Sequence, residues 1–241
     1  MNKNKKIIYI SVIVVVLIII CIFVYGIIEK NALKNELKSN KQFIETVEKN
    51  TDNIVSEQEK QMEKFTVSLV NANGLVMYEK LSTKNAKTYL KAADIDFFSE
   101  ILANWLPTNI DSGAEGTHNG RNYIAYTFYV ENIGQTTTNY TTTLEIDEVL
   151  EELDEVIRIM VIKNGNKTIY AKKNLNTGSA EPDTTPFYNQ DIVMVEKTEN
   201  FNVNDIDKYT VVIWAEGDDP ETLNNLAASG DIKIHMNLTE N

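Results

Sequence analysis

The segment VVIWAEGDDPET, residues 211–222, carries the densest group of side chains that could do chemistry in this chain of 241 residues. Glu216, Asp218, Asp219 and Glu221 follow one another closely behind an apolar run. Carboxylates at this density can hold a calcium ion, can act as a catalytic pair, or can simply be solvated in a turn. Their spacing lacks the alternating ligand positions of an EF-hand loop, so that type of calcium site is excluded.

The order Asp219-Pro220-Glu221 is typical of the start of a helix. Asp219 would be the N-cap, Pro220 the first helical residue, and Glu221 would favour the positive end of the helix dipole. This interpretation predicts a plain turn followed by a capped helix, and it leaves Glu216 and Asp218 unexplained. The alternative is a calcium site, with Glu216, Asp218 and Asp219 as candidate ligands. No other cofactor is predicted.

The remaining reactive side chains do not form a known catalytic motif. His118 and His235 are the two histidines, and neither lies in the HExxH pattern that a zinc peptidase of that type needs. We expect both to be exposed structural residues, His118 in a loop and His235 on the polar face of a strand. The sequence contains no GxSxG motif and no phosphate-binding glycine loop. A pair of carboxylates could hydrolyse a glycoside, but the 35 acidic residues do not single out two. We therefore predict no catalytic residue.

Charge and cysteine content exclude further classes of function. The formal net charge is −12, which would repel nucleic acid, so no nucleic-acid partner is predicted. Cys21 is the single cysteine, so the chain can form neither an internal disulfide nor a zinc site built from several thiolates.

The N-terminal region predicts a membrane anchor. Residues 7–28, IIYISVIVVVLIIICIFVYGII, contain no charge and are long enough to cross a bilayer. Lys3, Lys5 and Lys6 precede this run, so the positive-inside rule keeps residues 1–6 in the cytoplasm. The apolar run is longer than that of a cleaved signal peptide. We expect a single-pass protein of the cell membrane in type II orientation, with its C-terminal domain outside the cell.

Residues 29–64 predict a helical stalk. The segment has no Pro or Gly, and Leu33, Leu37, Ile44 and Val47 fall at near-heptad spacing. Polar residues interrupt this seam, so two interpretations stay open. The stalk is either a solvated helical linker or a coiled coil through which the chain self-associates.

Residues 65–241 predict a mainly β domain with a few short helices. Alternating apolar residues indicate strands at 122–132, 139–146, 191–196, 209–214 and 231–240. Asn164-Gly165 suits a type I′ turn between the arms of a hairpin at 157–173, and NANG at 71–74 suits a second hairpin turn. Many strands with hairpin and longer connections favour an antiparallel β-sandwich of jelly-roll or immunoglobulin-like type.

Three segments of this domain predict short helices. The first begins near Thr83 and includes Tyr89. The second, residues 92–107, places Ile95, Phe98, Leu102 and Trp105 on one helical face, and the third is the acidic segment 147–156. The glycines and small polar residues of 111–120 indicate a loop between the second helix and the next strand.

The strand ending in ENIGQTTTNYTTTLEI, the late VVIWAEGDDP and the closing GDIKIHMNLTE resemble the extracellular β-sandwich proteins of Gram-positive bacteria related to TasA and camelysin. The resemblance spans roughly residues 95–240. It implies a jelly-roll-like sandwich at the cell surface with a role in matrix fibres or the envelope. Camelysin-like members are described as metalloproteases, but His118 and His235 do not supply the corresponding motif. This chain also differs from the matrix proteins in its predicted uncleaved anchor, residues 7–28.

These observations predict a membrane-anchored protein of the bacterial cell envelope whose extracellular sandwich binds rather than catalyses. The expected partners are other envelope or matrix proteins, or cell-wall glycan. One alternative is a cell-wall hydrolase or peptidase. Another is an accessory membrane subunit of a secretion or conjugation system.

Overall fold

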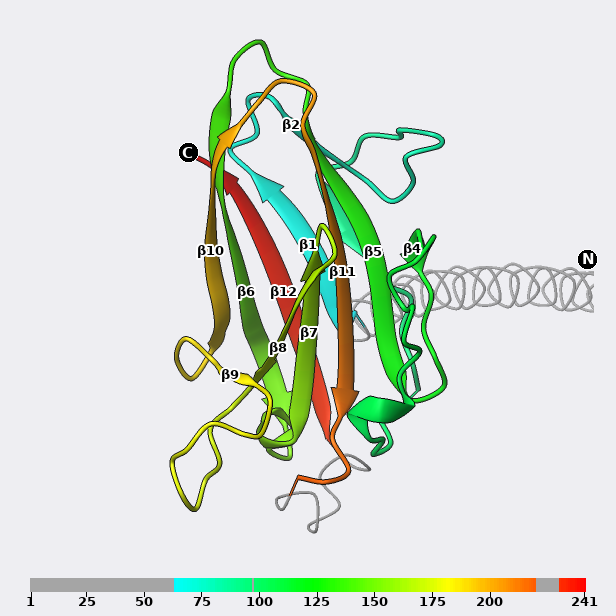
Figure 1. Cartoon of the computed structure of the whole chain (residues 1–241), viewed down its shortest axis with the longest axis vertical. Helices are drawn as coiled ribbons and strands as arrows, with labels where there is room; N and C mark the ends of the chain where they lie inside the picture. The colour runs from blue at the N-terminus through cyan, green and yellow to red at the C-terminus, as the bar shows by residue number, and fades with distance from the viewer. Residues whose placement is uncertain (1–62, 97, 220–229) are drawn as a thin grey trace, which may run out of the picture. The chain divides into compact units, whose positions relative to one another are not determined.

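The structure, a computed structural model, describes residues 63–96, 98–219 and 230–241. The described residues form a mainly β domain of two sheets packed against each other (Figure 1). The first strand begins at Phe65, the residue at which the sequence predicts the domain to start. The predicted anchor, residues 7–28, lies outside the described residues, as does the stalk up to residue 62. Within the described part of the chain, no helix is long and apolar enough to cross a membrane.

The two sheets, called sheet A and sheet B, interleave along the chain. In the described residues, sheet A consists in spatial order of β10 (Ile192–Phe201), β6 (Thr138–Leu150), β12 (Asp231–Glu240), β1 (Phe65–Val70) and β3 (Tyr89–Lys91). Sheet B consists of β2 (Leu75–Tyr78), β5 (Tyr123–Asn132), β11 (Ile206–Ala215), β7 (Ile157–Lys163), β8 (Asn166–Ala171) and β9 (Thr185–Pro186), with β4 (Gly116–Thr117) also paired to β5. Two short 3₁₀ turns complete the elements, η1 (Ala103–Trp105) and η2 (Leu153–Glu155).

The predicted antiparallel arrangement holds for most strand pairs but not for all. Strand β1 runs parallel to β12, and β8 runs parallel to β9. Parallel neighbours need a long connection, because the chain must return to the same end of the sheet. The pair β1–β12 meets this condition, because its two strands come from opposite ends of the domain.

The core lies between the facing surfaces of the two sheets. Phe65 of sheet A meets Tyr126 of sheet B edge to face, with ring centroids 6.0 Å apart. Within sheet B, Phe128 stacks on Tyr209 at 5.3 Å. Both contacts are of the kind that aromatic rings favour in protein interiors. The other face of sheet A is polar, which explains the apolar–polar alternation of β12 and much of β6.

Sheet B is covered on both faces, and this explains its long apolar runs. Ala125, Met160, Val212 and Trp214 point away from the main core and form a second buried cluster with Ile101 and Leu106. The segment that carries Ile101 and Leu106 therefore lies against the outer face of sheet B. A strand buried on both faces has no polar side to show, so VVIWA of β11 carries no alternation.

The hairpin at 157–173 is confirmed. Asn164 and Gly165 join β7 to β8, and both have positive φ, 51° and 81°. A type I′ turn requires this conformation at both central positions, and Gly and Asn adopt it most readily.

The predicted hairpin around NANG is wrong. The two predicted arms, on either side of NANG, are the strands β1 and β2, and these belong to different sheets. The turn is fixed by a tertiary contact, because the carboxylate of Glu240 accepts hydrogen bonds from the N–H groups of Asn73 and Gly74, at 2.5 and 3.0 Å. Gly74 also packs against Gly134, and a Cβ atom at Gly74 would meet the Gly134 Cα at 2.9 Å. The connection therefore crosses from one sheet to the other.

The three predicted helices are also wrong within the described residues. Tyr89 lies in β3, and of residues 92–107 only Ala103–Trp105 form a 3₁₀ turn. The N–H of Ile101 donates to Ala215 O and its carbonyl accepts from the Gly217 N–H, both at 3.0 Å. These bonds pair Ile101 with the end of β11 and the residues that follow it. The tertiary contact therefore overrides the helical spacing of this segment.

The acidic segment 147–156 continues β6 as far as Leu150. Glu151 and Glu152 then turn the chain with positive φ, and η2 buries Leu153. The end of the predicted stalk also differs from a helix. Lys64 lies outside any helix, directly before β1, and its Nζ donates to Asp231 Oδ1 at 2.5 Å.

Candidate ligand groove on the outer face of sheet B

Two neighbouring cavities lie on the outer face of sheet B. The first has a volume of about 270 Å³ and includes Arg158, Trp214 and Asp219 in its lining. The second has a volume of about 820 Å³ and includes Met160 and Ile162. Ala103 and Asn104 line both cavities, so the two meet at η1. We call the combined feature the outer groove.

Strand β7 supplies part of the floor of the outer groove. Ile157, Ile159 and Val161 face the core between the sheets. Side chains alternate along a strand, so Arg158, Met160 and Ile162 must face outward. Met160 and Ile162 join the second buried cluster, and Arg158 stands at the end where the first cavity lies.

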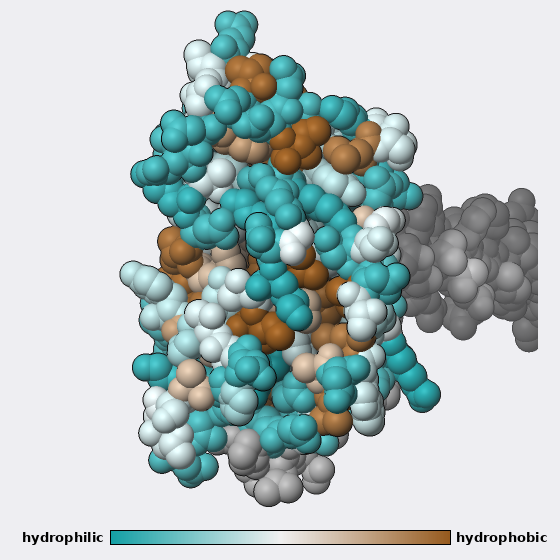
Figure 2. All heavy atoms as spheres, viewed as in Figure 1, coloured by the Kyte–Doolittle hydropathy of each residue, from teal (hydrophilic) through white to brown (hydrophobic). Residues whose placement is uncertain are grey.

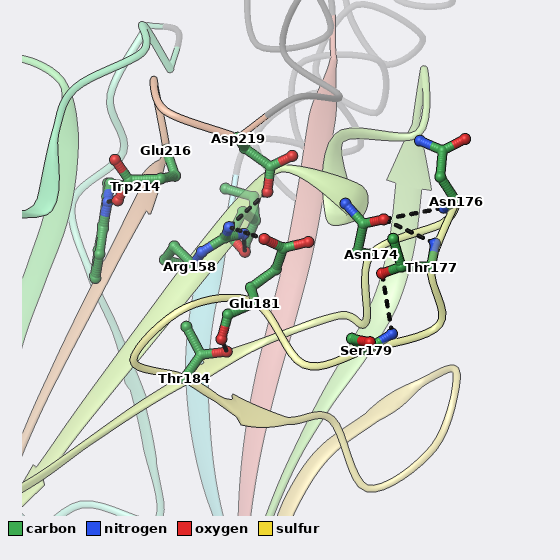
Figure 3. A network of polar contacts seen from close by, with 11 residues as sticks. Arg158, Asn174, Asn176, Thr177, Ser179, Glu181, Thr184, Trp214, Glu216 and Asp219 are labelled. Carbon is green, nitrogen blue, oxygen red and sulfur yellow. Dashed lines mark hydrogen bonds and ion pairs between the residues drawn. The ribbon is translucent and has the colours of Figure 1, made fainter.

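Arg158 is the centre of a buried ion pair at this end (Figure 3). Its Nη2 donates to Asp219 Oδ2 at 2.5 Å and lies 3.7 Å from Glu181 Oε2. The side chains of Arg158, Asp219 and Glu181 are 5%, 0% and 6% exposed. Charges removed from water this completely need a partner of opposite sign, and both carboxylates have Arg158 as theirs. These contacts hold together the three segments that carry the residues: β7, the loop after β11 and the loop before β9.

The loop before β9 forms the opposite wall of the first cavity. Its shape is held by local hydrogen bonds, in which the Thr184 hydroxyl donates to Glu181 O at 2.8 Å and the Asn174 side chain accepts from two backbone N–H groups of the same loop (Figure 3). Because the loop is fixed in this way, Glu181 is presented to Arg158 from a defined direction.

The structure brings the predicted site residues to the rim of this cavity. Glu216 and Asp218 line it together with Asp219. Glu216 accepts a hydrogen bond from the indole Nε1 of Trp214 at 3.0 Å, and its backbone N–H donates to Val156 O. Glu221 and the helix predicted after Asp219 lie outside the described residues, so the capping role stays a prediction.

Calcium ligation by Glu216, Asp218 and Asp219 also stays a prediction. The residues that the structure describes contain no group of three or more Asp, Glu, His or Cys side chains arranged to hold a metal ion. Asp219 already has a guanidinium at contact distance, and a calcium ion would have to compete with it.

Arg158 and Glu181 are functional candidates that the sequence interpretation missed. A signal for Arg158 exists, because it is the one charged residue within the apolar run VIRIMVI. A charge at an outward position of a strand that is otherwise apolar on both faces needs a partner. Nothing comparable singles out Glu181, which lies in a polar loop.

A series of hydrogen bonds begins at Lys208 and Asp111, two residues that line the second cavity. Lys208 Nζ lies 2.8 Å from Asp111 Oδ1, and Asp111 also accepts from the Thr210 hydroxyl at 2.5 Å. Thr210 contacts Thr127 at 2.7 Å, and Thr127 contacts His118 Nε2 at 2.9 Å. Asp111 and His118 therefore fasten both ends of one loop to adjacent positions of β5 and β11.

His118 is in a loop as expected, but it is half-buried and hydrogen-bonded rather than exposed. Burial, with Lys208 adding to it, lowers the pKa of His118 below its usual 6.5. His235 lies on the polar outer face of sheet A as predicted, but it too is half-buried rather than exposed. There it contacts Thr66 through Nδ1 at 2.5 Å and Asn237 through Nε2 at 3.0 Å, so the two histidines belong to opposite faces of the domain.

Comparison with known proteins identifies no family for this chain. No family model matches it, and no curated protein is similar to it in sequence. Among solved structures it is similar to the crystal structure of a β-glucosidase from Kluyveromyces marxianus in complex with glucose, at 11% identity and a TM-score of 0.26. That match covers 71% of this chain but only 18% of the β-glucosidase chain, and a likeness this low carries no argument about function.

Proposed function

We propose that this chain is a single-pass membrane protein of a bacterial cell envelope, whose extracellular β-domain acts by binding a ligand in the outer groove. The uncharged run at residues 7–28, with lysines on its N-terminal side, supports the anchor and its orientation. The groove is the observation that carries the binding role. Its larger cavity, about 820 Å³, is of the size that ligand sites use, and the smaller one, about 270 Å³, adjoins it.

The chemistry of the groove favours binding over hydrolysis. A general acid or base must present a carboxyl group to the substrate. Of the five carboxylates that line the smaller cavity, three are instead committed to structural contacts, because Asp219 and Glu181 share the guanidinium of Arg158 and Glu216 accepts from Trp214. Carboxylates committed in this way hold the walls of a site in place.

The order of the strands supports the jelly-roll subtype and, through it, the relationship to the TasA/camelysin-like proteins. A jelly roll distributes eight strands so that one sheet holds the first, eighth, third and sixth and the other holds the second, seventh, fourth and fifth. Sheet A matches with β1, β12, β6 and β10, and sheet B matches with β5, β11, β7 and β8. The parallel pairing of β1 with β12 departs from this pattern, in which neighbouring strands are antiparallel.

The net charge of −12 disfavours polyanionic partners, which leaves envelope or matrix proteins and cell-wall glycan as the expected ligands. Self-association through the stalk, residues 29–64, and calcium binding at Glu216, Asp218 and Asp219 remain part of the proposal.

Sedimentation with envelopes tests the proposed function. Full-length protein in detergent micelles is mixed with envelopes of the producing cells and pelleted. Ala103→Trp fills the junction of the two cavities, whereas Ala86→Trp introduces the same side chain at an exposed position between β2 and β3. We expect wild type and Ala86→Trp to pellet with the envelopes and Ala103→Trp to stay in solution.

Equal pelleting of all three proteins would exclude the outer groove as the binding site. If none of the three pellets, the binding role itself is wrong. In that case co-purification of a stable membrane complex from solubilised cells would favour an accessory subunit of a larger machine.

A further inference from the structure

Trp105 belongs to η1, the turn whose Ala103 and Asn104 line both cavities. Trp105 itself is 66% exposed and lies beside the cavities rather than in their lining, between Asn104 and Leu106, which line the larger one. The turn that carries it is fixed, since the Trp105 N–H donates to Leu102 O at 2.8 Å. The turn is fixed next to residues that line a groove, so the exposed indole that it carries is available as a contact surface for a ligand in that groove. The second tryptophan of the chain, Trp214, is fully buried.

The lining of the larger cavity combines apolar and polar side chains. Met160 and Ile162 form the floor, while Asn104, Asn109 and Ser112 contribute amide and hydroxyl groups to the wall. A pyranose ring has the matching pattern, because its faces carry C–H groups and its edge carries hydroxyls. Side chains that offer an apolar surface and a few polar groups are how binding sites recognise such amphipathic ligands.

An extended peptide fits this groove less well than a glycan does. Peptides that lie along a sheet gain affinity by adding to a free edge through main-chain hydrogen bonds. The outer groove lies on the face of sheet B, where β7 is already paired with β11 on one side and with β8 on the other. The groove therefore offers side-chain contacts without a main-chain ladder, which a sugar chain can use fully.

The charged side chains that line the smaller cavity restrict which glycans the outer groove can bind. Among the described residues, five carboxylates line the smaller cavity against one cation, Arg158: Glu181, Asp183, Glu216, Asp218 and Asp219. The larger cavity adds Lys167, Lys208 and Asp111, so carboxylates still outnumber cations in the outer groove as a whole. This excess of carboxylates would repel an anionic polysaccharide, but it accommodates neutral or amino-bearing sugars.

We infer that the outer groove binds an extended glycan of neutral or amino sugars, and that Trp105 is the residue on which one sugar ring stacks. The inference rests on the proposed function, because it names the ligand class of the same groove. It adds a specificity-determining residue and excludes acidic glycans.

Tryptophan fluorescence tests the stacking directly. Only Trp105 and Trp214 contribute, and Trp214 is shielded, so quenching by acrylamide reports mainly on Trp105. The probe is a soluble oligomer of β-1,4-linked N-acetylglucosamine, added to the full-length protein in detergent micelles, and its de-acetylated form is the second probe. We expect both probes to protect Trp105 from acrylamide, and the cationic form to bind more tightly at low salt.

Variants of exposed aromatic residues provide the controls. We expect Trp105→Ala, followed by calorimetry, to weaken binding by about tenfold, and Trp105→Tyr to retain most of the affinity. Tyr188→Ala removes another exposed aromatic ring, which lies in the connection between β9 and β10, and should leave the affinity unchanged. Equal binding by wild type and Trp105→Ala would overturn the stacking role.

Treated envelopes separate this inference from the proposed function. Muramidase cleaves the glycan strands of the envelope, and protease removes its proteins. If binding through the groove persists after muramidase but is lost after protease, the ligand is a protein, and the glycan inference is wrong while the binding function stands. Loss of binding after muramidase alone, with protection of Trp105 by either probe, supports the inference.

Discussion

The replacement Asp219→Asn distinguishes two roles of the same carboxylate. As an N-cap, Asp219 would need only a side-chain oxygen, which Asn supplies equally well, so the change would be close to neutral in stability. As the partner of Arg158, Asp219 must supply negative charge. The geometry at Arg158 makes the charge role dominant, and we expect Asp219→Asn to be clearly destabilising.

The magnitude follows from the burial of the pair. Breaking a buried ion pair by removing one partner typically costs about 3–5 kcal/mol. Glu181 stays 3.7 Å from Arg158 and keeps part of the neutralisation, so we expect Asp219→Ala to fall near the lower end, about 3 kcal/mol. Asp219→Asn keeps a hydrogen-bond acceptor but loses the charge, so we expect about 2 kcal/mol. The Asn variant therefore separates the two roles, because it should be near neutral if Asp219 acts only as a cap and should cost about 2 kcal/mol if Asp219 neutralises Arg158.

Urea denaturation followed by tryptophan fluorescence measures both values. Trp214 is well placed as a reporter, because it lines the same cavity as Arg158 and is fully buried. The triple variant Asp219→Asn/Glu181→Gln/Arg158→Met serves as the control, since it removes all three buried charges and should recover much of the loss. If Asp219→Asn unfolds within about 0.5 kcal/mol of wild type, the charge role is refuted and the capping role holds. The same melts with added calcium or EDTA test the calcium alternative, which requires calcium to stabilise the wild type.

Three further predictions concern other parts of the chain. The lowered pKa of His118 means that the folded state disfavours the protonated imidazole. The contribution of His118 to stability should therefore be fully present above pH about 6.5 and be lost as the pH falls towards the folded-state pKa. In a pH series of thermal melts, His118→Gln should reduce this loss of stability at acidic pH. Gly165→Ala should destabilise the domain by about 1–2 kcal/mol in urea melts, because Gly165 has φ +81°, and a replacement without effect would exclude a strained turn. Protease added to intact cells after wall removal should digest the domain beyond Phe65, whereas protection there with digestion in inverted vesicles would reverse the proposed orientation.

Features governed by local chemistry could be predicted from the sequence. The turn at Asn164-Gly165 depends on the φ preferences of two residues, and these act without help from the rest of the fold. The alternation of β12 reflects one buried and one solvated face, which the sequence displays directly. In both cases the signal and its cause lie within a few residues of each other.

Features governed by distant contacts could not be predicted. The segment 92–107 has helical spacing, yet Ile101 hydrogen-bonds to Ala215 and Gly217, far along the chain. The NANG turn is likewise decided by Glu240, which lies at the other end of the domain. In each case the pattern was present, but a partner that sequence periodicity does not reveal made another conformation more stable.

The candidate site combines a feature that could be predicted from local sequence with one that depends on a distant contact. The acidic segment at Glu216–Asp219 was identified from its composition, and it does line a cavity. Its most important partner, Arg158, is 61 residues away, so the composition of the segment alone suggests a metal or a cap. The isolated charge in VIRIMVI is the complementary signal, and combining the two would have predicted the ion pair.

The outer groove follows from the way in which sheet B is covered. Its strands are apolar on both faces, so the outer face needs a cover, and the segment with Ile101 and Leu106 supplies one. A loop does not fill space as completely as a second sheet, and cavities remain beside η1 where Ala103 and Asn104 are exposed. Sheet A needs no cover, because its outer face is polar. The same hydrophobic pattern that makes the two faces of the domain unequal therefore also places the outer groove on sheet B.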